Sequence, residues 1–348
     1  MGTQRVTQKD IAEKAGVGRT TVTLALQDHP KIAPETKKRI LEIARELGYQ
    51  PDPFLSGLAA YRSTKRSPAF HGTIAWLVNS LGDYDWREYP HYVGYFNGAS
   101  ARATYHGYKL EELHLHTSGI SAHRLAEILH ARNISGILVC PQPRAEMDLN
   151  FDWDAFSAIT FGYSLSKPRL HTVASAHYLN TRRALQILAA RGYERIGMVI
   201  DEEIDKRCGS NVYAGYLIEQ TLGRKEAIPP LFDYDSRHGP SKTEARKLVE
   251  YIKRHRLDVI LTSDYRILEN LRASGVAVPD EVGVASISLP SCNGPLSGIV
   301  EDCEQMGSIA VDLVVGMMHR GERGIPQACT RTHLEGIWYE GETVRPAV

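Results

Sequence analysis

The chain has 348 residues, of which 43% are hydrophobic and 24% charged, with 41 basic and 41 acidic side chains. This composition is typical of a folded protein of two or three domains and excludes a disordered or collagen-like chain. The five cysteines are scattered without a CxxC pair, which excludes a disulfide scaffold. No apolar run approaches the roughly 18 residues of a membrane span, and the first residues lack the apolar core of a signal peptide. We therefore expect a cytoplasmic protein without a membrane partner.

The charge is balanced overall but unevenly distributed. Residues 1–67 hold 12 basic and 7 acidic side chains, a net charge of +5, which leaves −5 on the rest of the chain. A basic segment ahead of an acidic body predicts that the segment meets an anion, and nucleic acid is the anion that fits best. Because an asymmetry of this size also arises by chance, the residue pattern of the segment has to show whether it binds nucleic acid.

Three short helices are predicted in the basic segment. Thr7, with an acidic residue three positions later, has the pattern of a capping box, and Gly16 is a natural end for the helix that follows. A second helix begins at Arg19, and a third has Pro34 in its first turn and stops at Gly48. Two short helices joined by a tight turn and supported by a third make a helix-turn-helix domain. The alternative is a three-helix bundle with an ordinary solvated face.

Polar side chains gather at the start of the second predicted helix, where a recognition helix reaches base edges and phosphates. They are Arg19, Thr20, Thr21 and Thr23. Lys31 follows in the next loop and can contact the phosphate backbone, which sets affinity but carries no sequence information. The segment is therefore predicted to bind double-stranded DNA.

Residues 6–49 resemble, without a gap, the headpiece of the LacI-type transcription regulators, the family of the lactose and purine repressors. The likeness rests on Val6–Ala12, Ala15–Val17, Thr21-Val22, Thr36 and Leu47–Tyr49. It implies phosphate contacts from Thr7, Thr21 and Tyr49. It implies base readout from Arg19, Thr20 and Leu24.

Three residues of the head depart from the family pattern. Leu24 stands where members usually carry an arginine aimed at guanine, so that contact is lost or becomes an apolar contact with a thymine methyl group. Gly18 and Ala33 replace the usual serine caps, so the second and third helices are expected to begin less firmly.

Residues 51–71 are predicted to form a hinge helix and linker. Two to three turns weakened by Gly57 do not hold as an isolated helix in water. The resemblance implies a hinge that is ordered only on operator DNA and paired with its dimer mate. Leu58-Ala59 matches the family's Leu-Ala step, in which the leucine wedges between base pairs in the minor groove. The alternative is that Leu58 packs against the body of the protein.

From Gly72 onward, strand and helix signals alternate, which is typical of a parallel sheet covered by helices on both faces. The predicted strands are 73–78, 108–115, 136–140, 157–161, 195–200, 258–261 and 282–287. The predicted helices are 92–106, 122–133, 180–191, 212–222, 242–256, 267–274 and 305–319. Their number suffices for two doubly wound lobes. We thus predict an all-α head over 1–50, the hinge over 51–71, and an α/β effector-binding and dimerisation domain over 72–348.

Several stretches of this body resemble the family's two-lobed effector domain, which is similar to periplasmic sugar-binding proteins. They are Ala190–Gly197, Ser274–Val282 and Met306-Gly307. The resemblance implies a first lobe of about 72–175 and 303–330 and a second lobe of about 176–302 and 331–348. A ligand cleft then lies between the lobes, and hinge closure around the ligand is the expected switch.

The second-lobe residues that the resemblance places in the cleft depart from the family's usual polar groups. Val212 replaces an arginine that grips sugar hydroxyls, Ser288 replaces an acid, and Ser263 replaces the asparagine before Asp264. These losses argue against simply assigning a small neutral sugar as the ligand.

The loop after the first predicted strand is rich in aromatic residues. Tyr84, Trp86 and Tyr89 lead this group, and His91 and Tyr92 follow. Aromatic side chains in a cleft can stack on a sugar ring or on a larger ring-bearing effector. The alternative is that they belong to a dimer interface, since aromatic residues are enriched at both kinds of site.

Sequence motifs of catalysis and cofactor binding are not found. There is no GxxxxGK[ST], HExxH or GxSxG sequence. His114 and His116 share a predicted strand face, but a third metal ligand is not evident nearby. The neighbouring Glu202 and Glu203 are interpreted as solvated charge. We expect no enzyme, no cofactor and no metal.

These features together predict a sequence-specific transcriptional regulator, with repression as the favoured role. A homodimer is expected to bind a near-palindromic operator, and a small-molecule effector, a saccharide or a derivative of one, is expected to switch its affinity for DNA. Two alternatives remain: a ligand-binding module whose head has lost DNA binding, and an enzyme that uses the cleft.

Overall fold

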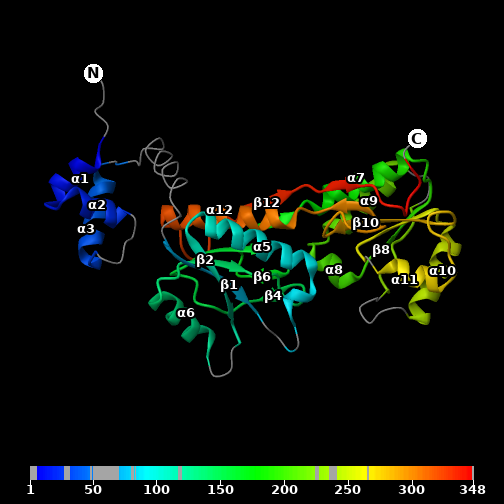
Figure 1. Cartoon of the computed structure of the whole chain (residues 1–348), viewed down its shortest axis with the longest axis horizontal. Helices are drawn as coiled ribbons and strands as arrows, with labels where there is room; N and C mark the ends of the chain where they lie inside the picture. Colours follow the sequence, from blue (N-terminus) through cyan, green and yellow to red (C-terminus); the bar gives the residue numbers. More distant parts are fainter. Residues whose placement is uncertain are drawn as a thin grey trace, which may run out of the picture. The chain divides into compact units, whose positions relative to one another are not determined.

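The computed structural model describes residues 6–26, 32–47, 49, 70–79, 82, 84–116, 120–223, 227–234, 241–264 and 266–346. The chain divides into two compact units, Met1–Ala69 and Phe70–Val348 (Figure 1). Lys31 and the hinge residues Leu58 and Ala59 lie outside the described residues.

In the described residues of the first unit, three short helices are present: α1 (Gln8–Ala15), α2 (Arg19–Leu26) and α3 (Pro34–Glu46). Their apolar faces meet in one small core, formed by Ile11, Ala12, Ala15, Val22, Ala25, Ile40 and Ala44. Gly16 follows α1 in the left-handed conformation, at φ 64°, which turns the chain sharply towards α2 without strain. The predicted helix-turn-helix head is confirmed.

Hydrogen bonds at the start of α1 satisfy a backbone group that would otherwise be unpaired. The backbone N–H of Thr7 donates to Asp10 Oδ2 (2.6 Å), and the Thr7 hydroxyl lies 2.8 Å from the same oxygen. Ala33, which precedes α3, makes no such side-chain bond. An alanine has no side chain that could cap the helix, so a less firm start of α3 stays a prediction.

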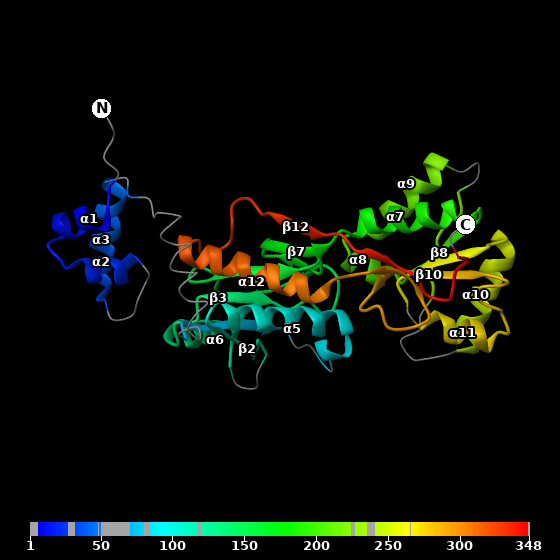
Figure 2. The same ribbon diagram turned by 45° about the horizontal axis from the view of Figure 1, so that its top comes forward.

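The first lobe of the second unit is built on a six-stranded parallel sheet with the strand order β12-β7-β5-β3-β1-β2 (Figure 2). Its strands are β1 (Gly72–Val78), β2 (Tyr108–His114), β3 (Gly136–Val139), β5 (Ser157–Phe161), β7 (His171–Ser175) and β12 (Arg331–Leu334). Helices α5 (Pro90–Tyr105) and α12 (Cys303–Arg320) cover one face, and α6 (Ala122–Ala131) covers the other. The central strands are apolar and buried because both faces of the sheet are covered. A small pair, β4 (Met147–Asp148) and β6 (Leu165–Lys167), lies outside this sheet.

The second lobe has a five-stranded sheet with the order β13-β11-β10-β9-β8. Its parallel strands are β8 (Ile196–Val199), β9 (Val259–Thr262), β10 (Gly283–Leu289) and β11 (Ser297–Val300), and β13 (Ile337–Tyr339) is antiparallel to β11. Helices α7 (His177–Ala190) and α9 (Asn211–Gly223) pack on one face, and α10 (Lys242–His255) and α11 (Ile267–Ala273) on the other. The short helix α8 (Glu202–Arg207) follows β8.

The chain passes three times between the lobes, after β7, after β11 and after β12. The last passage corrects the predicted boundary at 330, because Arg331–Leu334 pairs in parallel with β7 and so belongs to the first lobe. This edge strand is half exposed and alternates in burial. The sequence signal of a buried parallel strand is therefore missing from it.

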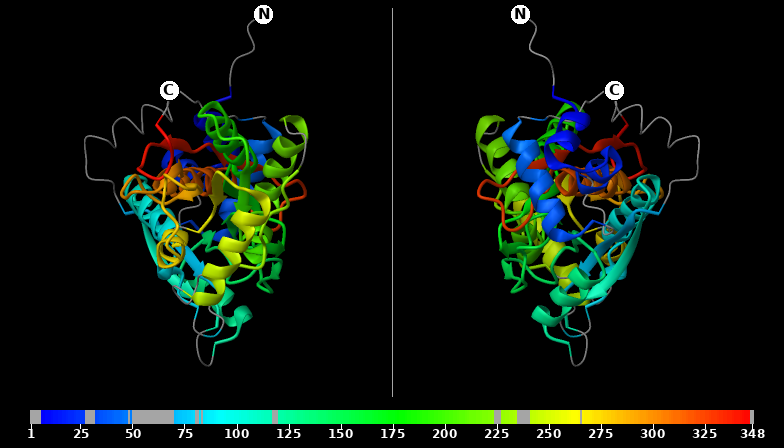
Figure 3. Two further views of the ribbon diagram at one scale, coloured as in Figure 1. Left: turned by 90° about the vertical axis from the view of Figure 1, so that its right-hand side faces the viewer. Right: turned by 90° about the vertical axis from the view of Figure 1, so that its left-hand side faces the viewer.

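Helices α5 and α12 lie side by side on the first sheet (Figure 3). Glycines allow the close approach: a Cβ atom at Gly98 would lie 1.8 Å from Glu304 O, and one at Gly307 would lie 2.0 Å from Tyr95 O. Within the described ranges, no helix combines the length and apolar composition that a membrane span needs.

Candidate functional site

The outer face of α2 carries the predicted DNA-reading residues. Arg19 and Thr20 are exposed at its first turn, and Thr21 and Leu24 are half-buried beside them. Within the described head, no carboxylate forms an ion pair with Arg19, whereas Lys14 is paired with Glu46 (2.9 Å). The guanidinium of Arg19 therefore remains available to an external anion.

Two other head residues are engaged inside the domain. The hydroxyl of Thr23 lies within hydrogen-bond distance of Gln8 Oε1 (2.9 Å) and Arg19 O (3.1 Å), so it holds α2 against α1. Tyr49 is half-buried against the head core, and its backbone N–H donates to Ala44 O (2.9 Å). Thr7 is exposed at the start of α1.

A polar network lies at the carboxyl ends of β1 and β3 in the second unit. The Asn79 side chain donates to Gln142 Oε1 (2.8 Å), and its own oxygen lies 2.9 Å from His116 Nε2. The backbone N–H of Gln142 donates to Ser164 Oγ (2.8 Å). Ligands of open α/β sheets bind at the carboxyl ends of the strands, so this is where an effector is expected.

Arg207, at the end of α8, extends from the second lobe to this network. Its guanidinium donates to Gln142 O (2.9 Å) and to the Tyr92 hydroxyl, and it lies 5.5 Å from the ring centroid of Tyr89. Its Nε is buried without a hydrogen-bond partner, and no carboxylate forms an ion pair with it among the described residues. Such a cation is suited to an anionic group of a ligand.

Sequence reasoning missed Arg207 because it looked for the cleft arginine at Val212. Val212 is 1% exposed and packs in the core of the second lobe, so its assignment to the effector site is wrong. One sequence signal could have identified Arg207. It lies in the segment directly after β8, at the carboxyl edge of the second sheet, where ligands of such sheets bind.

Four tyrosines form a continuous row of rings next to Arg207. Tyr89 stacks on Tyr92 (centroids 5.0 Å apart, 25° between planes) and contacts Tyr84, and Tyr92 contacts Tyr95. The Tyr84 hydroxyl donates to the carbonyl of Pro141 (2.9 Å). Burial raises the pKa of Tyr84 and of Tyr92 well above that of free tyrosine, so both phenols stay neutral donors. Tyr84 and Tyr89 thus lie together, with Tyr89 the more exposed.

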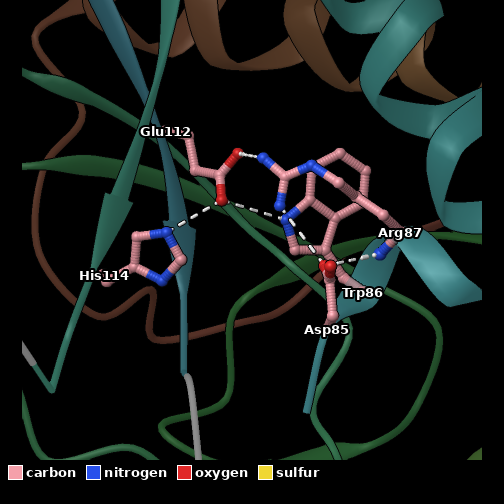
Figure 4. Close-up of polar contacts among 5 residues, drawn as sticks. All are labelled: Asp85, Trp86, Arg87, Glu112 and His114. Atoms are coloured by element: carbon pink, nitrogen blue, oxygen red, sulfur yellow. Dashed lines mark hydrogen bonds and ion pairs between the residues drawn. The ribbon is translucent and has the colours of Figure 1, made fainter. Parts of the chain in front are cut away.

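Trp86 does not belong to this row, which corrects its assignment to the effector site. It is 3% exposed and packs against Trp76 and Phe96 in the core of the first lobe. Figure 4 shows its indole N–H directed at Glu112, 3.3 Å from Oε1. The same carboxylate contacts His114 (2.8 Å). In a short loop, the sequence cannot distinguish an inward aromatic side chain from one in the cleft.

The Glu112 carboxylate also pairs with Arg87, which in turn contacts Asp85 (Figure 4). Asp85 caps the 3-10 turn η1 (Trp86–Glu88) by accepting from the Arg87 backbone N–H (3.0 Å), and that bond lowers the pKa of Asp85. This network fixes the loop that carries the tyrosine row.

Three remaining cleft candidates lie on the second sheet. Ser288 Oγ is 2.9 Å from His91 Nε2 of the first lobe, so it joins the lobes. At the end of β9, Ser263 Oγ and Asp264 Oδ2 are buried and have no hydrogen-bond partner among the described residues. Such atoms are rare in a folded interior and are satisfied when a ligand or water binds.

Glu203 also joins the lobes, contrary to its interpretation as solvated charge. Its Oε1 accepts from the backbone N–H of Ala145 (2.6 Å). A hollow of about 230 Å³ is lined by Pro90 of the first lobe and by Leu268, Leu289 and Tyr339 of the second. Polar bonds such as those of Ser288 and Glu203 therefore join the lobes, and residues of both lobes line one hollow.

Residues 7–52 match the model of the bacterial regulatory proteins of the lacI family, and residues 185–336 match the model of the periplasmic binding protein-like domain. The HTH-type transcriptional regulator CelR of Thermobifida fusca is 24% identical over 95% of this chain and 97% of its own. The HTH-type transcriptional repressor CytR of Escherichia coli K12 is 25% identical over 90% of this chain and 89% of its own.

Solved structures agree with the fold. The CelR–cellobiose complex covers 97% of this chain and 100% of its own at a TM-score of 0.55 and 21% identity. The lac repressor dimer bound to operator and the anti-inducer ONPF covers 98% of this chain and 99% of its own, at a TM-score of 0.56 and 17% identity.

A helix-turn-helix head before two doubly wound lobes of the periplasmic-binding-protein type defines a DNA-binding transcriptional regulator. The head matches the LacI family of bacterial regulatory proteins, and the chain is similar to transcriptional regulators along nearly its whole length.

Proposed function

We propose that this regulator is a repressor that binds a near-palindromic operator as a homodimer, and that a small molecule held between the lobes switches its affinity for DNA. The observation that carries the proposal is Arg207, a guanidinium without a carboxylate partner among the described residues at the carboxyl edge of the first sheet. A buried cation is costly unless it is paired, so its place is explained by a ligand that supplies the negative charge.

The effector class follows from the groups around Arg207. Tyr89 offers a partly exposed ring for stacking, while Ser263 and Asp264 offer buried oxygens that can bond to hydroxyl groups. A saccharide that carries a carboxylate or phosphate meets all three requirements. The CelR structure contains cellobiose, a neutral saccharide, and the replacement of the family's cleft arginine by Val212 favours a different ligand here.

The switch would act through the bonds that join the lobes. An effector that binds the guanidinium of Arg207 competes with the hydrogen bonds that Arg207 donates to Tyr92 and Gln142. The angle between the lobes would then change, and the order of the two hinge helices in the dimer would change with it. A ligand shifts this equilibrium only by its difference in affinity for the two arrangements.

In the head, we propose base readout by Arg19, Thr20 and Leu24 and phosphate contacts by Thr7, Thr21, Thr23, Lys31 and Tyr49. The exposed and unpaired Arg19 supports the first assignment. Leu58 and Ala59 are proposed to enter the minor groove at the centre of the operator. These two residues and Lys31 lie outside the described residues.

Calorimetric titration of the full chain with neutral sugars and with the matching sugar acids and phosphates tests the effector site. Arg207→Gln is expected to weaken the acidic ligand about 10- to 150-fold, since a hydrogen bond to a charged group contributes about 1.5–3 kcal/mol. The matched control is Lys206→Gln, because Lys206 is exposed and already paired with Glu202 (2.9 Å). A preference for neutral sugars, or equal affinity in both variants, would contradict the proposal.

Two further measurements address the alternatives. Selection of bound sequences from a random duplex pool, with and without the ligand, should yield a palindromic site whose enrichment depends on the ligand. A head that has lost DNA binding would enrich nothing under either condition. Chemical conversion of the ligand by the protein would instead favour the enzyme alternative.

A further inference from the structure

Three side chains with metal-binding atoms meet where the chain returns from the second lobe to the first. They are His91 in the first turn of α5, Glu301 just after β11, and Cys303 at the start of α12. One ligand atom from each lies within 4.8 Å of the other two. Glu301 is 4% exposed and Cys303 is 5% exposed, whereas His91 is half-buried, so two of the three side chains are shielded from water.

One oxygen of the carboxylate in this cluster lacks a hydrogen bond within the part of the chain that the structure describes. Glu301 Oε1 is buried and has no hydrogen-bond partner among the described residues. The nearest basic group is His177 Nδ1, 3.7 Å away, at the start of α7. Because a buried carboxylate requires a counter-charge or several donors, this oxygen points to a cation that completes its environment.

The surrounding contacts hold the three side chains in place. His91 Nε2 lies 2.9 Å from Ser288 Oγ, and such a hydrogen bond on one ring nitrogen orients the imidazole for a metal at the other. The backbone N–H of Glu301 donates to Leu289 O (3.0 Å), and that of Cys303 donates to Glu301 O (2.9 Å). A Cβ atom at Gly94 would lie 2.5 Å from Cys303 Cβ, so the glycine allows α5 to pack closely against Cys303.

We propose that His91, Glu301 and Cys303 bind one divalent transition-metal ion of the zinc class at the junction of the lobes. A thiolate, an imidazole and a carboxylate form the mixed set that zinc accepts, whereas Mg²⁺ and Ca²⁺ take oxygen ligands. On binding, the Cys303 thiol releases its proton to solvent and the thiolate forms the metal bond. His177, beside the carboxylate, is the candidate for the fourth position.

The site requires a small contraction. Metal–ligand distances of 2.0–2.3 Å place neighbouring ligand atoms of a tetrahedral site about 3.3–3.8 Å apart. The ligand atoms of the three side chains therefore have to move about 1 Å closer to one another, which small side-chain rotations provide. A bound ion would link α5 to the segment between β11 and α12 and so restrict the motion between the lobes.

The test uses the full chain, freed of metal with a chelator and titrated with Co²⁺ and then Zn²⁺. We expect one ion per chain by elemental analysis and a thiolate-to-cobalt charge-transfer band in the near ultraviolet that Zn²⁺ abolishes. Cys303→Ser should remove the band, and Glu301→Gln should weaken Zn²⁺ binding at least about tenfold. Zn²⁺ should also raise the thermal unfolding midpoint of the wild type but not that of Cys303→Ser.

Cys292→Ser is the matched control, because Cys292 is an exposed cysteine that does not belong to the cluster. Circular dichroism of each variant in chelator establishes that it is folded, and Glu301→Gln serves as the second probe if Cys303→Ser does not fold. The proposal is overturned if the wild type binds no ion at one per chain. A cobalt band that persists in Cys303→Ser, or unchanged Zn²⁺ affinity in Glu301→Gln, also overturns it.

Discussion

At the scale of single residues, two arginines share the property that they form no ion pair with a described carboxylate. Arg19 is exposed at the start of α2, whereas Arg207 is partly buried between the lobes and donates to Tyr92 and Gln142. An arginine held without a counter-charge is suited to an external anion. The expected anion differs: a base edge or phosphate for Arg19, and a small-molecule acid for Arg207.

Replacing Arg19 by alanine should cost about 1–3 kcal/mol on the specific operator and relax discrimination at one base pair, because a bidentate contact to guanine is lost. Binding to operators with each base pair substituted measures both effects. Lys38→Ala is the control: Lys38 is exposed on α3, and we propose that it contacts the phosphate backbone. Loss of such a contact should weaken binding to all sequences alike and reduce the salt slope by about 0.9. Uniform weakening by the Arg19 variant would make Arg19 a phosphate contact instead.

Asp10 makes the start of α1 sensitive to acid. The backbone N–H of Thr7 donates to its carboxylate and lowers the pKa of Asp10 below its ordinary value of 3.8. The contribution of this bond is therefore complete above the ordinary pKa and is lost as the pH falls through the lower, folded-state pKa. Asp10→Asn should make α1 open more readily at neutral pH, as measured by hydrogen exchange of its amides. An NMR titration that places the Asp10 midpoint at or above 3.8 would contradict the cap.

At the scale of secondary-structure elements, the pairing of α5 with α12 determines how the crossover segments are held. Both helices carry glycines at their contact, and both begin at residues of the metal cluster or next to them. Close helix packing tolerates no added volume where the neighbour is backbone.

Gly98→Ala should destabilise the second unit by at least about 1–3 kcal/mol, because its Cβ would overlap the backbone of Glu304. Gly316→Ala, on the partner helix α12, is the control. A Cβ atom at Gly316 would meet only the flexible end of Arg320, at 3.0 Å. Alanine also favours a helix over glycine by up to about 1 kcal/mol, so this variant should be neutral or stabilising. Urea unfolding of both compares them directly, and equal midpoints would show that the two helices can separate at little cost.

At the scale of the whole molecule, the proposed DNA-binding and effector-binding sites lie in separate units, and we propose that the hinge couples them. The prediction that Leu58 wedges into the operator belongs to this scale. Leu58→Ala should reduce operator bending and remove part of the affinity while leaving the salt slope unchanged, since an apolar side chain releases no counterions. Bending measured by fluorescence energy transfer across the operator tests this. An unchanged bend would assign Leu58 to packing against the body.

Much of this architecture is present in local sequence signals. The capping pattern at Thr7, the glycine at 16 and the proline at 34 predicted the boundaries of the head helices, because backbone groups at helix ends must be satisfied locally. The alternation of apolar strands and amphipathic helices predicted two doubly wound lobes. Periodicity reports burial on the faces of an element, and local sequence carries it directly.

The sites depended on contacts between residues far apart in the sequence. Arg207 reaches Gln142 and Tyr92 across the lobes, and His91 meets Cys303 after two passages of the chain. Trp86 and Val212 were assigned to the cleft because a sequence does not show which way a loop side chain turns or which strand lies beneath a helix. The sequence by itself thus determined the family, the helical head and the two lobes, because these follow from caps and periodicity. Only the tertiary structure decided which polar atoms remain without partners, because that depends on the packing of the whole chain.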